Sequence, residues 1–360
     1  MKDRLRLSLM FGCSTFLLAA CGMPLAGFLL GAEGFESPNP PTLVPATSTP
    51  TPFEPMGQVG TPWSGELPTQ GAAPVTTPTA TESNPWGDFD GPTQLSAIEI
   101  PPPVMPLALA DDVVNILLMG SDEAPDRYGH RTDTMIVISL DPSLKRVVML
   151  SIPRDLYVYI PGWRVDRVNV ASIFGGTHMV KQTMLYNFGI EIDYWAFINF
   201  EGFTQAIDQL GGIDVEAGGY LKDSCGGRTW TYSPGTYHMD GYSALCYVRM
   251  RKASSDFDRM RRQQEVVRAI FRRVLSLDGL SRVSQLYSDF DDLLDTDMDL
   301  GDMLPLLPLA KELAGGGASI ESYKIDQQVA KAWIVPSSGA WVLLPDRDAM
   351  QALVREAFLP

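Results

Sequence analysis

The fold is decided by one stretch, Val113-Val114-Asn115-Ile116-Leu117-Leu118-Met119-Gly120, a nearly continuous apolar run of strand length that stops at a glycine. Two runs of the same kind follow it, Thr134–Leu140 and Arg146–Ile152, and the sequence Asp141-Pro142-Ser143 between them has the composition of a turn. Strands that are apolar throughout, rather than at alternate positions, are typical of a sheet buried on both faces. We therefore predict a central sheet that is covered on each side.

Helices and strands alternate along the rest of the chain. The hydrophobic spacing predicts helices at Val180–Phe188, Glu201–Leu210, Asp258–Leu277, Leu300–Ala314 and Asp348–Phe358, and strands at Tyr194–Asn199, Ile213–Glu216, Ile320–Ile325 and Ala340–Leu344. Interleaving of this kind indicates the α/β class, and we predict a three-layer α/β/α sandwich around a mixed central sheet. The pattern leaves open whether the acidic region after residue 278 is an appended subdomain or an extension of the same sheet.

Charge is strongly segregated along the 360 residues. The formal net charge is -15, which argues against a general affinity for nucleic acid. No Lys or Arg lies between Arg6 and Arg127, whereas basic residues crowd into Arg249–Arg273. An arginine-rich segment in an acidic protein favours one bound anion over a broad basic surface, although some of these arginines could simply line a solvated helix face.

The N-terminus has the pattern of a membrane attachment. Lys2, Arg4 and Arg6 precede an uncharged stretch, Leu7–Ala32, which is long enough to cross a hydrocarbon core of ~30 Å. Basic residues before the stretch and none for a long way after it predict that the following domain lies outside the cell. Because Leu18-Ala19-Ala20-Cys21 resembles a lipobox, residues 1–32 are either a transmembrane anchor or a lipoprotein signal, and both place the protein at the cell membrane with its domain extracytoplasmic.

Residues 33–106 are rich in Pro, Thr and Ser, a composition that predicts a disordered extracellular linker. The catalytic domain is then expected at 107–277, with an acidic C-terminal extension at 278–360. Four cysteines are too few for a disulfide scaffold, but Cys225 and Cys246 lie in the folded part, where they either pair or stay free. The three histidines form no metal-binding cluster, so a zinc hydrolase is not expected.

The helix that begins near Asp258 carries two polar residues on its apolar face. Val266, Ile270 and Val274 form the apolar stripe, and continuing that stripe at i−4 spacing reaches Gln263 and Arg259. Both side chains are therefore expected to point inward near the positive end of the helix dipole. A buried arginine needs an anionic partner, which is either a ligand or a structural salt bridge to a residue such as Asp256.

The opposite side of this helix is polar and is expected to face solvent as ion pairs. Its residues are Arg261, Glu265, Arg268 and Arg272. Arg262 lies between the two sides, and the spacing does not assign it.

Further arginines fall at the ends of predicted strands, where open α/β folds bind ligands. Arg131 and Asp133 lie at one strand entrance, and Arg154 follows another strand. Arg249 and Arg251 are two residues apart, so they would share a side if the chain is extended there. Guanidinium groups suit phosphate oxygens better than ammonium groups do.

A pair of aspartates could hold a metal ion beside these arginines. Asp122 follows the first strand, and together with Asp133 it could bind Mg²⁺, which takes one or two carboxylates plus substrate phosphates. A role in capping or in a turn is the alternative for Asp122.

The ordered series of motifs resembles the LytR-CpsA-Psr family across Asp111 to about Leu275. The matching stretches include Asn115–Gly120, Arg131–Thr134, Ser151–Asp155, Asp193–Trp195, Asn199–Phe203, Leu210–Val215, Met239–Leu245, Tyr247–Arg251 and Asp256–Gln264. This resemblance implies a Mg²⁺-dependent phosphotransferase outside the membrane. Such an enzyme would move a glycopolymer from an undecaprenyl-pyrophosphate carrier to peptidoglycan or another cell-wall acceptor, and release undecaprenyl phosphate.

The resemblance also implies roles for individual residues. Asp122 and Asp133 would bind Mg²⁺, and the pyrophosphate would be held by Arg131, Arg154, Arg249, Arg251, Arg259 and Gln263. Further substrate contacts are assigned to Arg167, Asp256 and Arg262. The polyprenyl chain would need an apolar tunnel, for which the candidate wall residues, otherwise ordinary core, are Met179, Val180, Met184, Trp195 and Phe197. Two other functions stay open: hydrolysis of the lipid pyrophosphate, and binding of polyprenyl phosphates without turnover.

Overall fold

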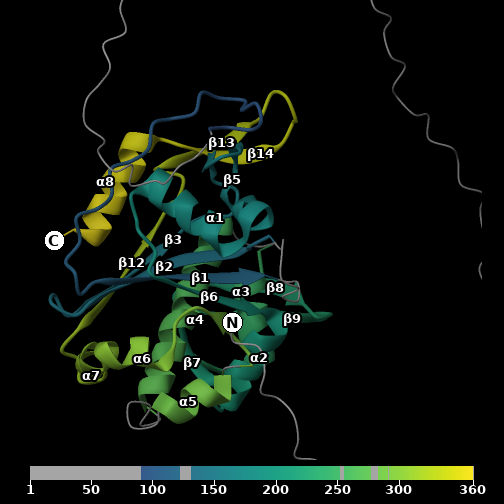
Figure 1. The fold of residues 1–360 in the computed structure, drawn as a ribbon. Helices are drawn as coiled ribbons and strands as arrows, with labels where there is room; N and C mark the ends of the chain where they lie inside the picture. Colours follow the sequence, from purple (N-terminus) through teal and green to yellow (C-terminus); the bar gives the residue numbers. More distant parts are fainter. Residues whose placement is uncertain (1–90, 122–130, 252–254, 277–282, 291, 360) are drawn as a thin grey trace, which may run out of the picture. The chain divides into compact units, whose positions relative to one another are not determined.

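A six-stranded mixed sheet forms the centre of the fold in the computed structural model, which describes residues 91–121, 131–251, 255–276, 283–290 and 292–359 (Figure 1). The strand order is β11-β6-β1-β2-β3-β12. The strands are β1 (Val114–Ser121), β2 (Thr134–Asp141), β3 (Arg146–Ser151), β6 (Tyr194–Asn199), β11 (Asp295–Thr296) and β12 (Ser319–Lys324). The β1–β6 and β3–β12 pairs are parallel and the other three are antiparallel, so the predicted α/β class with a mixed central sheet is confirmed.

Helices pack on both faces of this sheet, as Figure 1 shows. One face carries α1 (Ala171–Phe188) and α8 (Arg347–Phe358), whose apolar side chains join Leu117, Val137 and Leu150 in one buried cluster. The other face carries α4 (Asp256–Ser276) and α7 (Leu307–Ala314), which pack against the neighbouring positions Ile136, Ile138 and Met149. Because successive side chains of a strand point to opposite faces, strands covered on both sides must be apolar along their whole length.

The first strand departs from this pattern in a way that matters for the site. Buried and half-buried residues alternate along β1, whereas β3 is buried from Val147 to Ser151. The half-buried positions of β1 are Val114, Ile116, Leu118 and Gly120. Ile116, Leu118 and Gly120 line cavities on the α4 face, so this face of β1 is apolar without being closely packed.

The remaining elements surround this core. They are β4 (Tyr157–Ile160), β5 (Arg164–Arg167), α2 (Phe200–Gln209), β7 (Ile213–Ala217), β8 (Leu221–Cys225), β9 (Arg228–Tyr232), β10 (Gly235–Met239), α3 (Gly241–Arg249), α5 (Val283–Phe290), α6 (Leu300–Met303), β13 (Ala330–Ile334) and β14 (Trp341–Pro345), with short 3₁₀ turns at Val168–Val170 and Leu304–Leu306. The segment predicted as helical at Leu300–Ala314 is divided into α6, a 3₁₀ turn and α7. Prolines at Pro305 and Pro308 stand near the start of the second and third pieces, where a missing N–H costs least.

Both boundaries expected for the catalytic domain fall inside this folded unit. Before residue 107, Gln94 and Val104 already donate backbone hydrogen bonds to Trp163 and Tyr186. After residue 277, β11 and β12 pair with strands of the central sheet, so the C-terminal region is an extension of the same sheet. The segment 1–32 lies outside the described residues, and none of the helices in the described part of the chain is long and apolar enough to cross a membrane.

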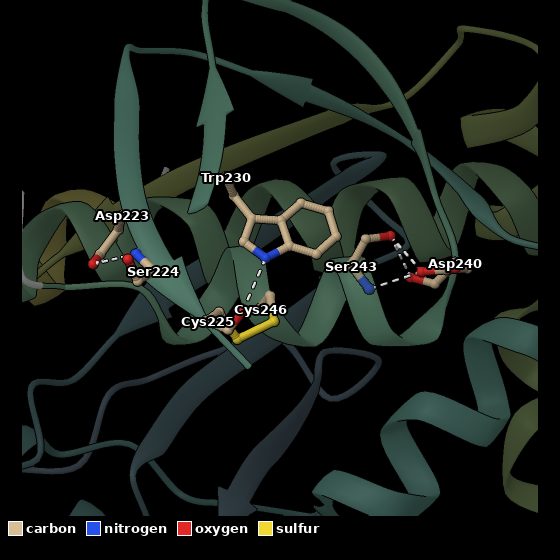
Figure 2. Close-up of a disulfide and its surroundings, with 7 residues drawn as sticks. All are labelled: Asp223, Ser224, Cys225, Trp230, Asp240, Ser243 and Cys246. Atoms are coloured by element: carbon tan, nitrogen blue, oxygen red, sulfur yellow. Dashed lines mark hydrogen bonds between the residues drawn. A yellow bond between two sulfur atoms is a disulfide. The ribbon is translucent and has the colours of Figure 1, made fainter. Parts of the chain in front are cut away.

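Cys225 and Cys246 form a disulfide, with their Cα atoms 5.7 Å apart (Figure 2). The bond joins the end of β8 to the middle of α3. Trp230 on β9 donates a hydrogen bond from its indole nitrogen to the carbonyl of Cys225 at 3.3 Å. The β8–β9 hairpin is thereby fixed to the helix that ends at Arg249.

Candidate active site

The candidate site lies at one edge of the central sheet, where β1 and β6 end and β2 begins. Asp133 is held there by its backbone N–H, which donates to the carbonyl of Gly120 at 2.8 Å. Arg154 follows β3, which is antiparallel to β2, so the end of β3 meets the start of β2. The guanidinium of Arg154 reaches Asp133, with Nη1 2.7 Å from Oδ1.

Asp155 links this ion pair to a second arginine. Its Oδ2 lies 3.4 Å from Nε of Arg154, and its Oδ1 lies 3.6 Å from Nη1 of Arg167. Burial disfavours the charged form of Arg154, but the hydrogen bond and charge of Asp133, with the charges of Asp155 and Asp256, outweigh it and raise the pKa of Arg154. The carboxylates therefore fix the arginine before any ligand arrives. Sequence reasoning assigned no role to Asp155.

Arg259 points inward from the first turn of α4, as its spacing predicts, and is only 7% exposed. Its Nη2 lies 2.8 Å from Oδ1 of Asp256, so the structural salt bridge considered for this residue is present. Burial is the largest cause that lowers the pKa of Arg259; Arg154 and Arg251 act in the same direction, against Asp256 and Asp133. The surroundings therefore raise the pKa of Arg154 but lower the pKa of Arg259.

Gln263 also points inward and is 9% exposed. Its amide nitrogen donates to the hydroxyl of Thr134 at 2.7 Å, which ties α4 to the first residue of β2. Gln264, for which the sequence predicted nothing, donates to the carbonyl of Tyr323 and the hydroxyl of Ser151, each at 2.8 Å. The two glutamines therefore set the distance between the start of α4 and the ends of three strands.

The sequence suggested that Arg249 and Arg251 could share one side of an extended segment, but Arg249 is helical in the structure. Arg249 is the last residue of α3, and its guanidinium lies 4.2 Å from the ring centroid of Phe200. Arg251 is exposed, and its charge is one of those that lower the pKa of Arg259.

Arg262 is buried, at 1% exposure. Its guanidinium donates to the backbone carbonyls of Tyr247, at 3.0 Å, and of Met250. A direct substrate contact by Arg262 stays a prediction. In the structure, its guanidinium binds backbone carbonyls.

Two of the predicted residues add little to the described geometry. Arg131 is exposed and lies next to the buried Thr132 at the entrance to β2. Asp122 lies outside the described residues.

Three buried polar atoms at the site have no hydrogen-bond partner within the described ranges. They are Nε of Arg259, Oγ1 of Thr132 and Oδ1 of Asn169, whose backbone N–H donates to the carbonyl of Arg154 at 3.3 Å. Leaving such groups unpaired costs about 1–3 kcal/mol each. A ligand or water bound at the site could complete the hydrogen bonds of these groups.

An apolar cavity of about 150 Å³ begins beside the charged residues, with Asp133 and Gln263 in its lining. Its walls come from the α4 face of the sheet and from α2, α3 and α4, and they include Leu118, Ile198, Phe203, Val248, Val267 and Ile270. A second apolar cavity of about 390 Å³ continues along α4 toward α5, α6 and α7, and Leu294 lines both.

The residues predicted as tunnel walls lie elsewhere. Val180 and Met184 belong to the buried cluster on the α1 face, and Met179, Trp195 and Phe197 pack against it. The alternative of ordinary core, which the sequence left open, therefore applies to this set.

Comparisons with known proteins agree on one family. The model of the LytR_cpsA_psr family matches residues 85–358. The chain is 35% identical over 223 residues to the polyisoprenyl-teichoic acid–peptidoglycan teichoic acid transferase TagU of Oceanobacillus iheyensis, a match that covers 60% of this chain and 67% of that protein. It is 31% identical over 224 residues to TagT of Bacillus subtilis, which bears the same description; this covers 59% of the chain and 68% of TagT.

Solved structures show the same similarity. The crystal structure of B. subtilis TagV matches with a TM-score of 0.59 at 26% identity, over 69% of this chain and 98% of that one. A structure of TagT bound to LI-WTA matches with a TM-score of 0.55 at 26% identity, over 71% of this chain and 94% of that one.

Proposed function

The chain belongs to the LytR-CpsA-Psr family, and we propose that it transfers a glycopolymer from an undecaprenyl-pyrophosphate carrier to a cell-wall acceptor such as peptidoglycan, releasing undecaprenyl phosphate. The relatives TagU and TagT are described as transferases that move teichoic acid from a polyisoprenyl carrier to peptidoglycan. That description supports the reaction class, and the chemistry of this chain's own site supports the assignment of residues.

One observation carries the proposal: residues that contact Arg154 or neighbour Arg259 line an apolar cavity. Asp133, the partner of Arg154, and Gln263, one turn from Arg259, both line that cavity. A lipid pyrophosphate has the same division, with a doubly charged head joined to a hydrocarbon chain. The two adjoining cavities, about 150 and 390 Å³, offer the chain an apolar path along α4.

The arrangement suits transfer at phosphorus. An acceptor hydroxyl attacks the glycan-bearing phosphorus and gives up its proton to solvent. The bond from that phosphorus to the bridging oxygen breaks, and the lipid phosphate leaves with the bond electrons. Negative charge grows on the leaving phosphate, where fixed arginines stabilise it most. Arg154 is already oriented by Asp133 and Asp155, and Arg259 by Asp256, so little reorganisation is needed during the reaction.

Dependence on Mg²⁺ is part of the proposal. In the described part of the chain, no group of three or more His, Cys, Asp or Glu residues could hold a metal. Mg²⁺ needs fewer protein ligands, because it takes one or two carboxylates and completes its shell with substrate phosphates and water. The carboxylate of Asp133, 31% exposed and at the cavity mouth, fits that requirement, with Asp122 as the proposed second ligand. When bound, the ion would neutralise phosphate charge and polarise the phosphorus–oxygen bond.

The proposed location is the outer face of the cell membrane, with residues 1–32 as the transmembrane or lipid anchor. The disulfide between Cys225 and Cys246 supports an oxidising compartment, because disulfides persist outside the cytosol and are rare within it.

Turnover can be tested with the full-length chain, Mg²⁺ and an undecaprenyl-pyrophosphate-linked glycan, with and without peptidoglycan fragments. We expect release of undecaprenyl phosphate together with glycan joined to the fragments. Release in the absence of fragments would favour hydrolysis, and binding with no release in either case would favour a non-catalytic protein. Arg154→Ala should abolish release, whereas Arg164→Ala, which removes an arginine paired to Asp166 within β5, should not.

A further inference from the structure

The end of α3 is held from two sides, immediately around Arg249. On one side the disulfide fixes Cys246, three residues before Arg249, to the β8–β9 hairpin (Figure 2). On the other side Arg262 donates from Nε to the carbonyl of Tyr247 and from Nη2 to the carbonyl of Met250. Helix ends leave their last carbonyls without intrahelical partners, so a buried donor pair at this point fixes where the helix stops.

The position of Arg262 connects two parts of the site. It lies in α4 between Arg259 and Gln263, the second of which lines the cavity, and its guanidinium donates to residues on either side of Arg249. Burial is the main cause that lowers the pKa of Arg262. Such burial is costly for an arginine unless its donors are satisfied, and two of the acceptors here are the backbone carbonyls of Tyr247 and Met250.

We propose that Arg262 is a positioning residue of the pyrophosphate site, acting through Arg249 and Arg251 without touching the substrate. It fixes the end of α3 so that Arg249 stays over Phe200, which lines the cavity, and it holds the carbonyl of Met250, the residue immediately before Arg251. This inference rests on the proposed function, because it assumes that these arginines bind the pyrophosphate.

Lysine should replace Arg262 only in part. The planar guanidinium donates in two directions at once, and here it reaches carbonyls three residues apart in the chain. A lysine ammonium is a compact donor group that could satisfy one of the two carbonyls, so it would hold the helix end less firmly.

The test measures binding of inorganic pyrophosphate to the full-length chain by titration calorimetry, in two backgrounds. In the wild-type background, Arg262→Met should weaken binding about tenfold, the loss expected for about one charge-assisted hydrogen bond, and Arg262→Lys should weaken it less. In the Arg249→Ala/Arg251→Ala background, Arg262→Met should change affinity by less than about twofold, because the groups it positions are gone.

Arg273→Met is the matched control. Arg273 also belongs to α4 and also donates to a backbone carbonyl at a helix end, from Nε to Leu210 at 2.8 Å, but at the end of α2. It should lower the melting temperature and leave pyrophosphate affinity unchanged.

An equal loss on Arg262→Met in both backgrounds, or a loss of affinity on Arg273→Met of the same size, would overturn the proposal. If Arg262→Met does not fold, the same comparison is made with Arg262→Lys, for which full affinity would also overturn it. Absence of pyrophosphate binding by the wild-type chain would instead count against the proposed function.

Discussion

The two faces of the central sheet are built from the same strands, yet one is closely packed and the other is hollow. On the α1 face, Leu117, Val137 and Met184 are completely buried, and the cluster continues into α8. On the α4 face, the neighbouring residue Leu118 is half-buried and lines a cavity with Val267. Alternate residues of one strand therefore serve different purposes, stability on one face and binding on the other.

The hollow face also carries the charged residues at its edge. Arg259 and Gln263 project from α4, the helix that covers this face, whereas the buried polar residues of α1, Thr183 and Asn187, donate to the backbone carbonyls of Met179 and Tyr159. Close packing stabilises a fold but leaves no room for a ligand. The difference predicts that substitutions on the α4 face change function more than stability, and that those on the α1 face do the reverse.

The largest effect is expected from Arg259→Ala on the hollow face. Removing one fixed donor to a developing negative charge typically lowers kcat roughly 10²- to 10³-fold. The fold should survive, because the interaction that is lost is the ion pair with Asp256, a carboxylate 28% exposed to solvent, and Nε of Arg259 has no partner among the described residues. The measurement is the rate of lipid phosphate release with circular dichroism as the check on folding. The control is Arg268→Ala, an arginine of the same helix bonded to Ser322; an equal loss of rate there would contradict the prediction.

The next largest effect is expected from Met184→Ala on the packed face. Met184 is 0% exposed, and truncating a buried methionine to alanine typically costs about 2–5 kcal/mol. Urea unfolding should show this loss of stability, while the turnover rate per folded molecule should stay near the wild-type value. A large drop in turnover with unchanged stability would reverse the assignment of the two faces.

The same substitution on both faces sharpens the comparison further. Val137→Phe overpacks the α1 face and should cost about 1–3 kcal/mol, whereas Val267→Phe has the cavity of about 150 Å³ to occupy and should cost less. Val267→Phe should instead weaken binding of a lipid pyrophosphate while leaving inorganic pyrophosphate affinity unchanged. Equal destabilisation by the two variants, measured in urea, would show that the α4 face is closed in solution.

The smallest effect is expected from Asp240→Ala at the N-cap of α3, an exposed position. Its carboxylate accepts from the backbone N–H and the hydroxyl of Ser243, and these bonds lower its pKa. Loss of such a cap costs about 1 kcal/mol. Because the folded-state pKa is depressed, the contribution is present above the unfolded pKa of about 3.9 and is lost as pH falls through the folded pKa. Melting curves of the two proteins should therefore converge in acid; a constant gap from pH 7 to 2 would contradict this.

The sequence predicts the strands of the sheet and the inward direction of Arg259 and Gln263, because both depend on local spacing. It could not place Arg262, whose partners are backbone carbonyls of a helix that begins about twenty residues earlier in the chain. Nor could the sequence identify the face that holds the cavity, because Val180 in the packed core and Leu118 in the cavity wall are both simply apolar residues. The helix predicted at 300–314 is interrupted near Pro305 and Pro308, and these prolines already indicate such an interruption in the sequence.

The parallel pairing of β12 with β3 has a consequence for how the protein folds during synthesis and for how it tolerates truncation. Register contacts run from Arg146↔Ser319 to Ser151↔Lys324, so the strand that precedes Arg154 acquires its outer neighbour only after residue 324 has been synthesised. Contacts between residues so distant in sequence form late and slow folding. A chain truncated after residue 277 would leave β3 as a bare apolar edge, open to pairing with another chain. Such a fragment should aggregate more readily than a chain that keeps residues 278–360.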